Sequence, residues 1–188
     1  WVLKQAMLEG KAFIEINPDL VIDVNLSYTQ ISQARFRDVL QDLLKETAYP
    51  AKNLCLELTE SCRNLNVKLL REEVSFYKSL GVKIAIDDFG TGSSCLALLR
   101  DLPNVDCLKL DQSFILNLPN NNIDQNIVDA FVQCANNLHM SVCLEGVENK
   151  FIKSLVEKYK VTSHQGYLYS RPVSVEKYME LLKNKIII

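Results

Sequence analysis

Two adjacent carboxylates, Asp87 and Asp88, stand where a short apolar strand, Ile84–Ile86, should end. Gly90-Thr91-Gly92 follows as a loop, and a helix is expected from Ser93 to Leu99. Carboxylate oxygens at a strand end, backed by a flexible loop, suit hard divalent cations. The alternative is a polar turn between strand and helix with Asp88 as a cap. The pair alone leaves both interpretations open.

The composition is that of an ordinary globular domain, and we treat residues 1–188 as one domain. The chain is 48% hydrophobic and 23% charged, with a net charge of −2. This balance gives no basic face for duplex nucleic acid, so we expect no such partner. No apolar run approaches the ~20 residues of a membrane span. We therefore expect a cytoplasmic protein, although upstream segments of a longer parent could attach it to a membrane.

The six cysteines form no C-x-x-C pair, and Cys55, Cys107 and Cys143 lie inside apolar runs. There a thiol behaves as a small hydrophobic group, so we expect reduced, buried cysteines. His139 and His164 do not have the spacing of zinc ligands. The sequence therefore favours no structural zinc site.

Strands and helices alternate along the chain, which predicts a parallel sheet with right-handed crossovers. The predicted strands are Val21–Ser27, Leu54–Glu60, Ile84–Ile86, Val105–Asp111, Ser141–Val147 and His164–Tyr169. The predicted helices are Trp1–Leu8, Phe36–Leu44, Val67–Leu80, Ser93 to about Arg100, Ile123–Leu138, Lys150–Tyr159 and Val175–Lys183. An Asn-rich linker from Leu116 to Asn122 is expected to be a loop.

Polar residues gather near the ends of these predicted strands. They are Asn25, Glu57, Glu60, Asp87, Asp88, Lys109, Asp111, Glu145 and Glu148. A (β/α)8 barrel builds its site from strand ends in this way, whereas an open doubly wound sheet gathers ligand groups at one switch point. The sequence has no G-x-G-x-x-G, P-loop or G-x-S-x-G motif, which argues against a nucleotide cofactor and a serine nucleophile.

The length is too short for a complete barrel, which takes about 250 residues. The 188 residues supply about six βα units, so we predict an incomplete TIM-type barrel whose first two strands lie upstream of Trp1. Because an open sheet edge invites pairing with another chain, we expect a homodimer or higher oligomer.

Carboxylates and an amide that converge on a barrel mouth could bind two Mg²⁺ or Mn²⁺ ions, clamp a phosphodiester and activate water. Asp87 is the best bridging ligand, Lys109 could steady the water or the phosphate charge, and Glu145 could be a base or a further ligand. For Glu60, Asp111 and Glu148 taken singly, a solvated strand end or a helix cap is the stronger interpretation.

Several segments together resemble the EAL domain, the cyclic di-GMP phosphodiesterase family of bacterial signalling proteins. The matching segments are Val24–Ser27, Glu57–Ser61, Asp87–Gly92, Leu108–Asp111 with Ser113-Phe114, Glu145–Glu148 and Gln165–Tyr167. They occur in the family's order and cover essentially the whole chain, so the domain assignment is an N-terminally truncated EAL domain over residues 1–188.

The resemblance implies hydrolysis of cyclic di-GMP to linear pGpG at a two-metal site. It implies that Asn25, Glu57 and Asp87 bind one metal and that Asp87 and Asp88 reach the second. By the same match, Lys109 positions the water, Glu145 is in the metal-site and general-base position, and Gln165 supports the site. Glu60 anchors the loop that contains Phe89, Gly90, Thr91 and Gly92, and in the family this loop couples metal binding to dimerisation.

The Glu-Ala-Leu motif that names the family, with its metal-binding glutamate, is absent from this chain. Two histories fit: this chain is a piece of a competent enzyme, or the parent is degenerate and has lost the motif. The retained downstream ligands favour a competent parent, and we expect weak or no activity from the present chain alone. Smaller departures are Gln112, where Arg is usual, Leu144, where Ala is usual, and Asn149, where Thr is usual. The alternatives are a non-catalytic cyclic di-GMP receptor and a signalling or dimerisation domain, in a parent with a sensory or GGDEF domain upstream.

Overall fold

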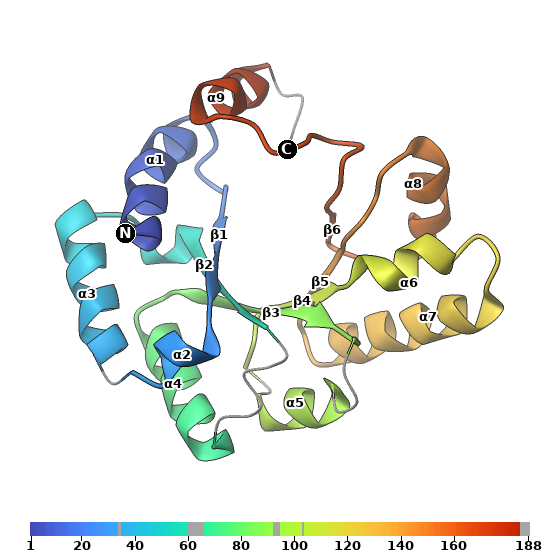
Figure 1. Ribbon diagram of the computed structural model, residues 1–188, viewed down its shortest axis with the longest axis horizontal. Helices are drawn as coiled ribbons and strands as arrows, with labels where there is room; N and C mark the ends of the chain where they lie inside the picture. Colours follow the sequence, from blue (N-terminus) through green and yellow to red (C-terminus); the bar gives the residue numbers. More distant parts are fainter. Residues whose placement is uncertain (34, 60–65, 92–94, 103, 185–188) are drawn as a thin grey trace. The chain divides into compact units, whose positions relative to one another are not determined.

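The computed structural model describes residues 1–33, 35–59, 66–91, 95–102 and 104–184 (Figure 1). The chain divides into two compact units, the first Trp1–Ala85 with Val173–Ile188 and the second Ile86–Pro172. The strands belong to one six-stranded sheet, in which they follow one another in chain order from β1 to β6. This sequential order agrees with the predicted alternation of strands and crossover helices.

The first unit carries the start of the sheet and most of the longer helices. Its elements are α1 (Val2–Ile16), β1 (Ile22–Leu26), α2 (Tyr28–Ile31), α3 (Arg35–Thr47), the 3₁₀ turn η1 (Ala51–Asn53), β2 (Leu54–Thr59), α4 (Val67–Ser79), the first residues of β3 (Lys83–Phe89) and α9 (Val175–Lys183). β1 and β2 are parallel, in a register that sets Asn25 opposite Glu57. The two residues predicted to bind metal in this unit are thus neighbours on adjacent strands.

Helix α1 is twice as long as the sequence suggested, because Gly10 does not end it. A Cβ atom at position 10 would lie 2.9 Å from Cε2 of Tyr49, so the glycine allows the Tyr49 ring to pack against the helix. Met7 and Phe13 are buried on the same helix, which continues to Ile16. The prediction of a helix over Trp1–Leu8 was right in type and wrong in length, because tertiary packing outweighs the low helix propensity of one glycine.

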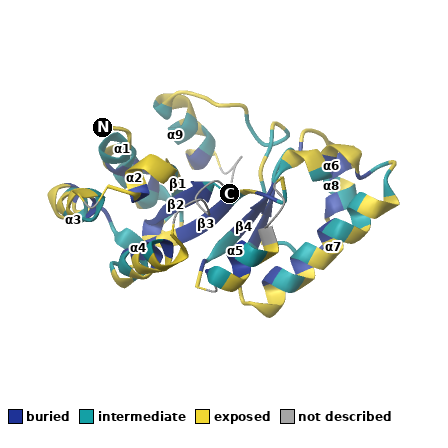
Figure 2. Cartoon of the chain, turned by 60° about the horizontal axis from the view of Figure 1, so that its bottom comes forward, coloured by how far each residue is buried: buried dark blue, intermediate teal, exposed yellow. Residues whose placement is uncertain are grey.

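The second unit completes the sheet. Its elements are the end of β3, α5 (Cys95–Asp101), β4 (Cys107–Leu110), α6 (Gln112–Asn117), α7 (Asn122–Asn137), β5 (Ser141–Leu144), α8 (Lys150–Val156) and β6 (Ser163–His164). β4, β5 and β6 pair in parallel. Figure 2 shows the strands largely buried and the outer faces of the helices exposed. The apolar residues Leu108, Leu110, Val142 and Leu144 form part of this core.

Side-chain caps begin several of these helices and explain one error of prediction. Asp111 Oδ1 accepts a hydrogen bond from the backbone N–H of Ser113 at 2.9 Å, so a helix starts at Gln112 and ends at Asn117. The predicted loop Leu116–Asn122 is therefore shorter than expected. Asn149, one of the family departures, caps α8 by accepting from Ile152 N–H at 2.9 Å. An amide oxygen here performs the capping that a threonine hydroxyl also performs.

The predicted strand His164–Tyr169 is mostly wrong, because β6 ends at His164. The following residues form a turn that is bound to Val147. Val147 N–H donates to Gln165 O at 3.0 Å, and Leu168 N–H donates to Val147 O at 3.1 Å. A Cβ at Gly166 would lie 2.3 Å from Val147 O, so only glycine permits this approach.

Cys55 and Cys143 are buried, whereas Cys107 and Cys134 are partly exposed. The prediction of burial is therefore right for Cys55 and Cys143 and wrong for Cys107, and reduced thiols stay a prediction. No helix in the described part of the chain is long and apolar enough to cross a membrane.

Candidate active site

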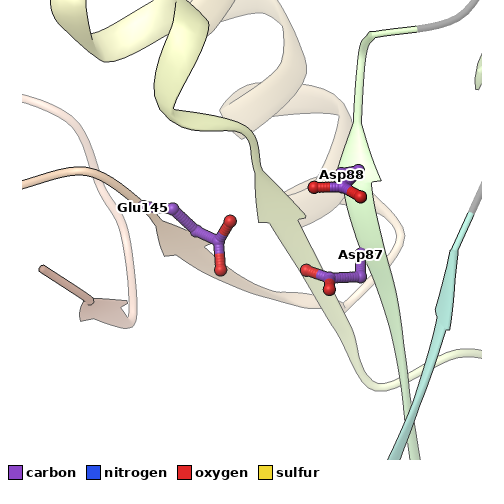
Figure 3. A group of neighbouring side chains, drawn as sticks. All are labelled: Asp87, Asp88 and Glu145. Atoms are coloured by element: carbon purple, nitrogen blue, oxygen red, sulfur yellow. The ribbon is translucent and has the colours of Figure 1, made fainter. Parts of the chain in front are cut away.

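The carboxylates of three residues of the second unit, Asp87, Asp88 and Glu145, lie close together (Figure 3). Asp87 and Asp88 lie near the end of β3, and Glu145 directly follows β5. One oxygen atom from each carboxylate lies within 4.8 Å of the other two. A set of donors made only of carboxylate oxygens fits hard divalent cations such as Mg²⁺, Mn²⁺ or Ca²⁺.

Lys109 links two of these carboxylates. Its Nζ atom lies 2.9 Å from Asp87 Oδ1 and 2.8 Å from Glu145 Oε1, and its side chain is only 7% exposed. Successive side chains of a strand point to opposite faces, so Lys109 projects away from its buried neighbours Leu108 and Leu110. Because side-chain direction alternates along β4, the buried ammonium group of Lys109 lies at the carboxylate cluster.

The cluster holds more negative charge than Lys109 neutralises, and burial makes the charged forms of two of its members less favourable. Burial raises the pKa of Glu145, while the hydrogen bond from Lys109 partly opposes the rise. Partial burial also raises the pKa of Asp88, and the negative charge of Asp87 adds to the effect. A cation bound among these oxygens would relieve both the desolvation and the repulsion.

The backbone of Asp88 is left-handed, with φ +53°, which is uncommon for a residue with a side chain. Thr91 holds this conformation, because its backbone N–H and its Oγ1 hydroxyl both donate to Asp88 O, at 3.4 and 2.9 Å. Phe89 is fully buried, with its ring edge-to-face against Phe131 at 5.2 Å between centroids. Such strain persists only where packing imposes it, and here it accompanies an Asp88 side chain that joins the carboxylate cluster.

A cavity of about 260 Å³ opens beside the carboxylates. It is lined by Asp88, Asp111, Gln112, Glu145, Gly146, Glu148, Gln165, Gly166 and Tyr167. The predicted supporting residues Asp111, Glu148 and Gln165 thus line one cavity, and Asp111 is in addition the cap of α6. The predictions of a cap and of a site residue are both compatible with this position.

The remaining predicted residues are Asn25, Glu57, Glu60 and the loop residues Phe89 to Gly92. Asn25 and Glu57 lie opposite each other in the register of β1 and β2 in the first unit, and Glu57 is buried. The loop residues Phe89, Gly90 and Thr91 adjoin Asp88. Glu60 and Gly92 lie outside the described residues.

Sequence reasoning gave no role to Gly146 and Tyr167, although both line the cavity. A Cβ at Gly146 would lie 2.5 Å from Gln112 Cβ, so the glycine lets α6 approach the site closely. The glycine that directly follows Glu145 was an available signal for such an approach. Tyr167 lies in the matching segment Gln165–Tyr167, so the resemblance to the family was an available signal for it.

Comparison with known proteins agrees with this geometry. The family description "EAL domain" matches residues 1–172. A cyclic di-GMP phosphodiesterase of Escherichia coli, PdeF, is 38% identical over 92% of this chain and 23% of its own length. The EAL domain of Mycobacterium smegmatis DcpA has a TM-score of 0.91 at 32% identity, over 98% of this chain and 83% of that chain. The manganese and cyclic di-GMP complex of Klebsiella pneumoniae BlrP1 has a TM-score of 0.76 at 26% identity, over 90% of this chain and 45% of that one.

The chain therefore belongs to the EAL family. Its α/β fold is of the TIM-like barrel type that EAL domains form, and an incomplete barrel is consistent with the six strands. The chain spans about a quarter of the length of the curated relatives that it matches, 25% of one and 23% of another.

Proposed function

We propose that this domain is a metal-dependent phosphodiesterase that hydrolyses cyclic di-GMP to linear pGpG in its parent protein. The observation that carries the proposal is the cluster of Asp87, Asp88 and Glu145 with a buried lysine between two of them. Relatives named cyclic di-GMP phosphodiesterases support the choice of substrate. A relative studied with manganese and cyclic di-GMP supports a divalent cation, for which we propose Mg²⁺ or Mn²⁺.

In this proposal Asp87 and Asp88 hold the cations, and Glu145 lies beside them. Bound cations supply positive charge that polarises the phosphodiester and makes water more acidic. Lys109 fixes Glu145 through Oε1, which leaves Oε2 to accept a proton from the attacking water. One water adds to the phosphorus, one P–O bond breaks, and the released oxygen takes a proton.

Asn25 and Glu57 stay predicted metal ligands on the strength of the family resemblance. Asp111, Glu148 and Gln165 stay predicted supporting residues. Glu60 and the loop from Phe89 to Gly92 keep the predicted role of coupling the metal site to a homodimer. For the parent we further propose a cytoplasmic location. We also propose an upstream sensory or GGDEF domain, because the relatives are about four times as long as their match to this chain.

The experiment is to incubate an N-terminally extended form of the protein with cyclic di-GMP and Mg²⁺ or Mn²⁺, and to quantify pGpG by chromatography. Asp87→Asn should lower kcat/KM at least about 100-fold, since disturbing even the partners of a metal ligand costs 10- to 100-fold. Asp129→Asn, on the exposed face of α7, is the matched control and should retain the parent activity. The present chain, tested in parallel, is expected to give little or no product.

The two alternatives predict different results. A receptor would bind cyclic di-GMP without forming pGpG, and a pure interaction domain would not bind it with or without Mn²⁺. Lys109 favours the enzyme, because a receptor needs no group that orients water and its base. Absence of pGpG from the extended protein, with Asp87→Asn indistinguishable from it, would reject the phosphodiesterase.

A further inference from the structure

His164, the last residue of β6, has one ring nitrogen that is bonded and one that is buried without a partner. Its Nδ1 atom lies 3.2 Å from the hydroxyl of Tyr169, five residues further along the chain. Its Nε2 atom is buried and has no hydrogen-bond partner among the residues that the structure describes. Leaving a buried polar atom unbonded costs free energy, so the closed arrangement around this ring is less stable than a fully bonded one.

The contact between His164 and Tyr169 closes the turn that follows β6. Val147 N–H donates to Gln165 O at 3.0 Å and fixes the start of the turn. Tyr169 N–H donates to Gly166 O at 3.1 Å, and the Tyr169 hydroxyl meets the His164 ring, so both contacts fix the end of the turn. Gln165, whose side chain lines the cavity beside the carboxylates, therefore lies in a segment that is held at both ends.

The surroundings of the His164 ring keep it uncharged at neutral pH. Burial lowers the pKa of His164 below its ordinary value of 6.5, the negative charge of Glu157 opposes this, and the positive charge of Lys153 adds to it. Lys153 and Glu157 pair with each other at 3.6 Å, so their effects on the ring largely offset. On β5 the register partner of His164 is Leu144, which is apolar and buried.

Protonation of this ring changes what the closed turn costs. A neutral imidazole has one donor nitrogen and one acceptor nitrogen, whereas the imidazolium ion has two donors. In the closed turn the Nε2–H group of the ion is a buried, charged donor without an acceptor among the described residues, and such a group is far more costly than a neutral one. Opening of the turn lets water accept this hydrogen bond. Acid therefore favours the open turn.

We propose that His164 and Tyr169 form a proton-sensitive latch that holds Gln165 at the cavity and releases it in acid. The latch is complete above the ordinary histidine pKa of 6.5 and weakens as the pH falls below that value. Because one proton is bound on opening, the opening equilibrium changes by up to about 10-fold per pH unit. His164 and Tyr169 are positioning residues, since they act on the site through Gln165. Only this effect on the site rests on the proposed function.

Hydrogen exchange of the present chain, followed by NMR spectroscopy, tests the latch itself. The amide of Tyr169 reports opening of the turn, because it is bonded to Gly166 O. Relative to an unstructured peptide at the same pH, its protection should fall by up to about 10-fold per unit from pH 6.5 to about pH 5. His164→Gln retains a side chain that can bond Tyr169 but does not titrate, so its protection should not change over this range.

The matched control is His139→Asn, which removes the other histidine of the chain. His139 is exposed and has a left-handed backbone with φ +60°, a conformation that asparagine adopts readily. This variant should lose Tyr169 protection in acid as the parent does. Constant protection in the parent, or an equal fall in His164→Gln, overturns the latch.

The pH profile of the extended protein tests the link from the latch to the site. Between about pH 7.5 and about pH 5, kcat/KM should fall about 3-fold or more further in the parent than in His164→Gln. The carboxylates of the cluster titrate in both proteins, so their effect cancels from the comparison. Equal profiles overturn the link to Gln165. If no pGpG forms at any pH, the proposed function fails, and a loss of Tyr169 protection that His164→Gln abolishes still supports the latch.

Discussion

Each unit of the chain contains an ion pair with at least one buried member, and the two pairs differ in charge balance. In the first unit Glu73, which is 4% exposed, faces Arg37. Arg37 donates from Nε and Nη2 to Oε1, both at 2.9 Å, and Tyr77 OH donates to Oε2 at 2.8 Å. Both oxygens of one carboxylate are therefore bonded, and one cation balances one anion. In the second unit a single lysine faces several carboxylates.

This difference shows up in the titration of the two groups. The hydrogen bond that Arg37 donates to Glu73 raises the pKa of Arg37, so the pair stabilises its charged form. In the second unit burial raises the pKa of Glu145 and Asp88, so their charged forms are disfavoured. A balanced pair stabilises a fold, whereas a surplus of one charge favours binding of the opposite charge. The sharpest way to test this distinction is to break each cluster and compare stability with function.

The largest effect is expected from Glu73→Ala, which leaves Arg37 without its buried partner. Glu73→Ala removes the acceptor of the Arg37 and Tyr77 hydrogen bonds, and bonds to charged groups contribute about 1.5–3 kcal/mol each, so we expect a loss of about 3 kcal/mol. Urea unfolding followed by circular dichroism measures the loss, and activity per folded molecule should not change. Glu72→Ala is the control, because Glu72 makes an exposed pair with Lys68 at 4.0 Å worth less than about 0.5 kcal/mol. Equal losses in both variants would contradict the structural role of the first pair.

Addition of Mn²⁺ tests the charge surplus of the second cluster. At about 100 times the dissociation constant, a ligand that binds only the folded state adds about 2.7 kcal/mol to the free energy of unfolding. We expect this gain in the parent chain and a much smaller one in Asp87→Asn, measured by urea titration with and without Mn²⁺. Glu73→Gln should show the full gain relative to its own metal-free baseline. A gain that Asp87→Asn retains would place the bound cation elsewhere.

The last effect concerns alkaline pH, because each unit contains a buried acid whose pKa is raised. Burial raises the pKa of Tyr49 from 10.0 to about 12, and that of Cys143 from 9.0 to about 12. Each contributes stability that is complete below its unfolded pKa and is lost as the pH rises through the folded value. The midpoint temperature of thermal unfolding should therefore fall as the pH rises. The fall should begin at about pH 9 for Cys143 and at about pH 10 for Tyr49, and it should continue to about pH 12.

Two substitutions assign this loss to its sources. Tyr49→Phe should remove the part that begins near the higher pH, and Cys143→Ala the part that begins near the lower one. Tyr28→Phe, at an exposed position of α2, should leave the profile unchanged. A profile that none of the three variants alters would show that other groups control alkaline unfolding.

The sequence predicted the second cluster better than the first, for a physical reason. Asp87, Lys109 and Glu145 stand out because each is a polar residue beside a buried strand, and parallel strands bring their ends together. Glu73 does not stand out, because a charged residue in an amphipathic helix is normally solvated. Its partner Arg37 is 36 residues away on another helix, and no local pattern reveals that pairing.

Backbone conformation was the second kind of feature that the sequence did not predict. The left-handed Asp88 and the turn at Gly166 depend on contacts with Thr91 and Val147, which spacing alone does not show. The short β6 follows from that turn, since a chain bound to Val147 cannot continue as a strand. The helix caps at Asp111 and Asn149 were accessible in principle, because aspartate and asparagine favour such positions.

The contact between Gly10 and Tyr49 makes the tolerance of one position depend on the residue at the other. Alanine is the better helix former by about 1 kcal/mol, so Gly10→Ala alone trades a gain in α1 against a clash with the Tyr49 ring. With a smaller side chain at position 49 the clash disappears and the same substitution becomes favourable. Evolution of these two sites is therefore epistatic: whether an exchange at position 10 is beneficial or harmful depends on which residue already occupies position 49.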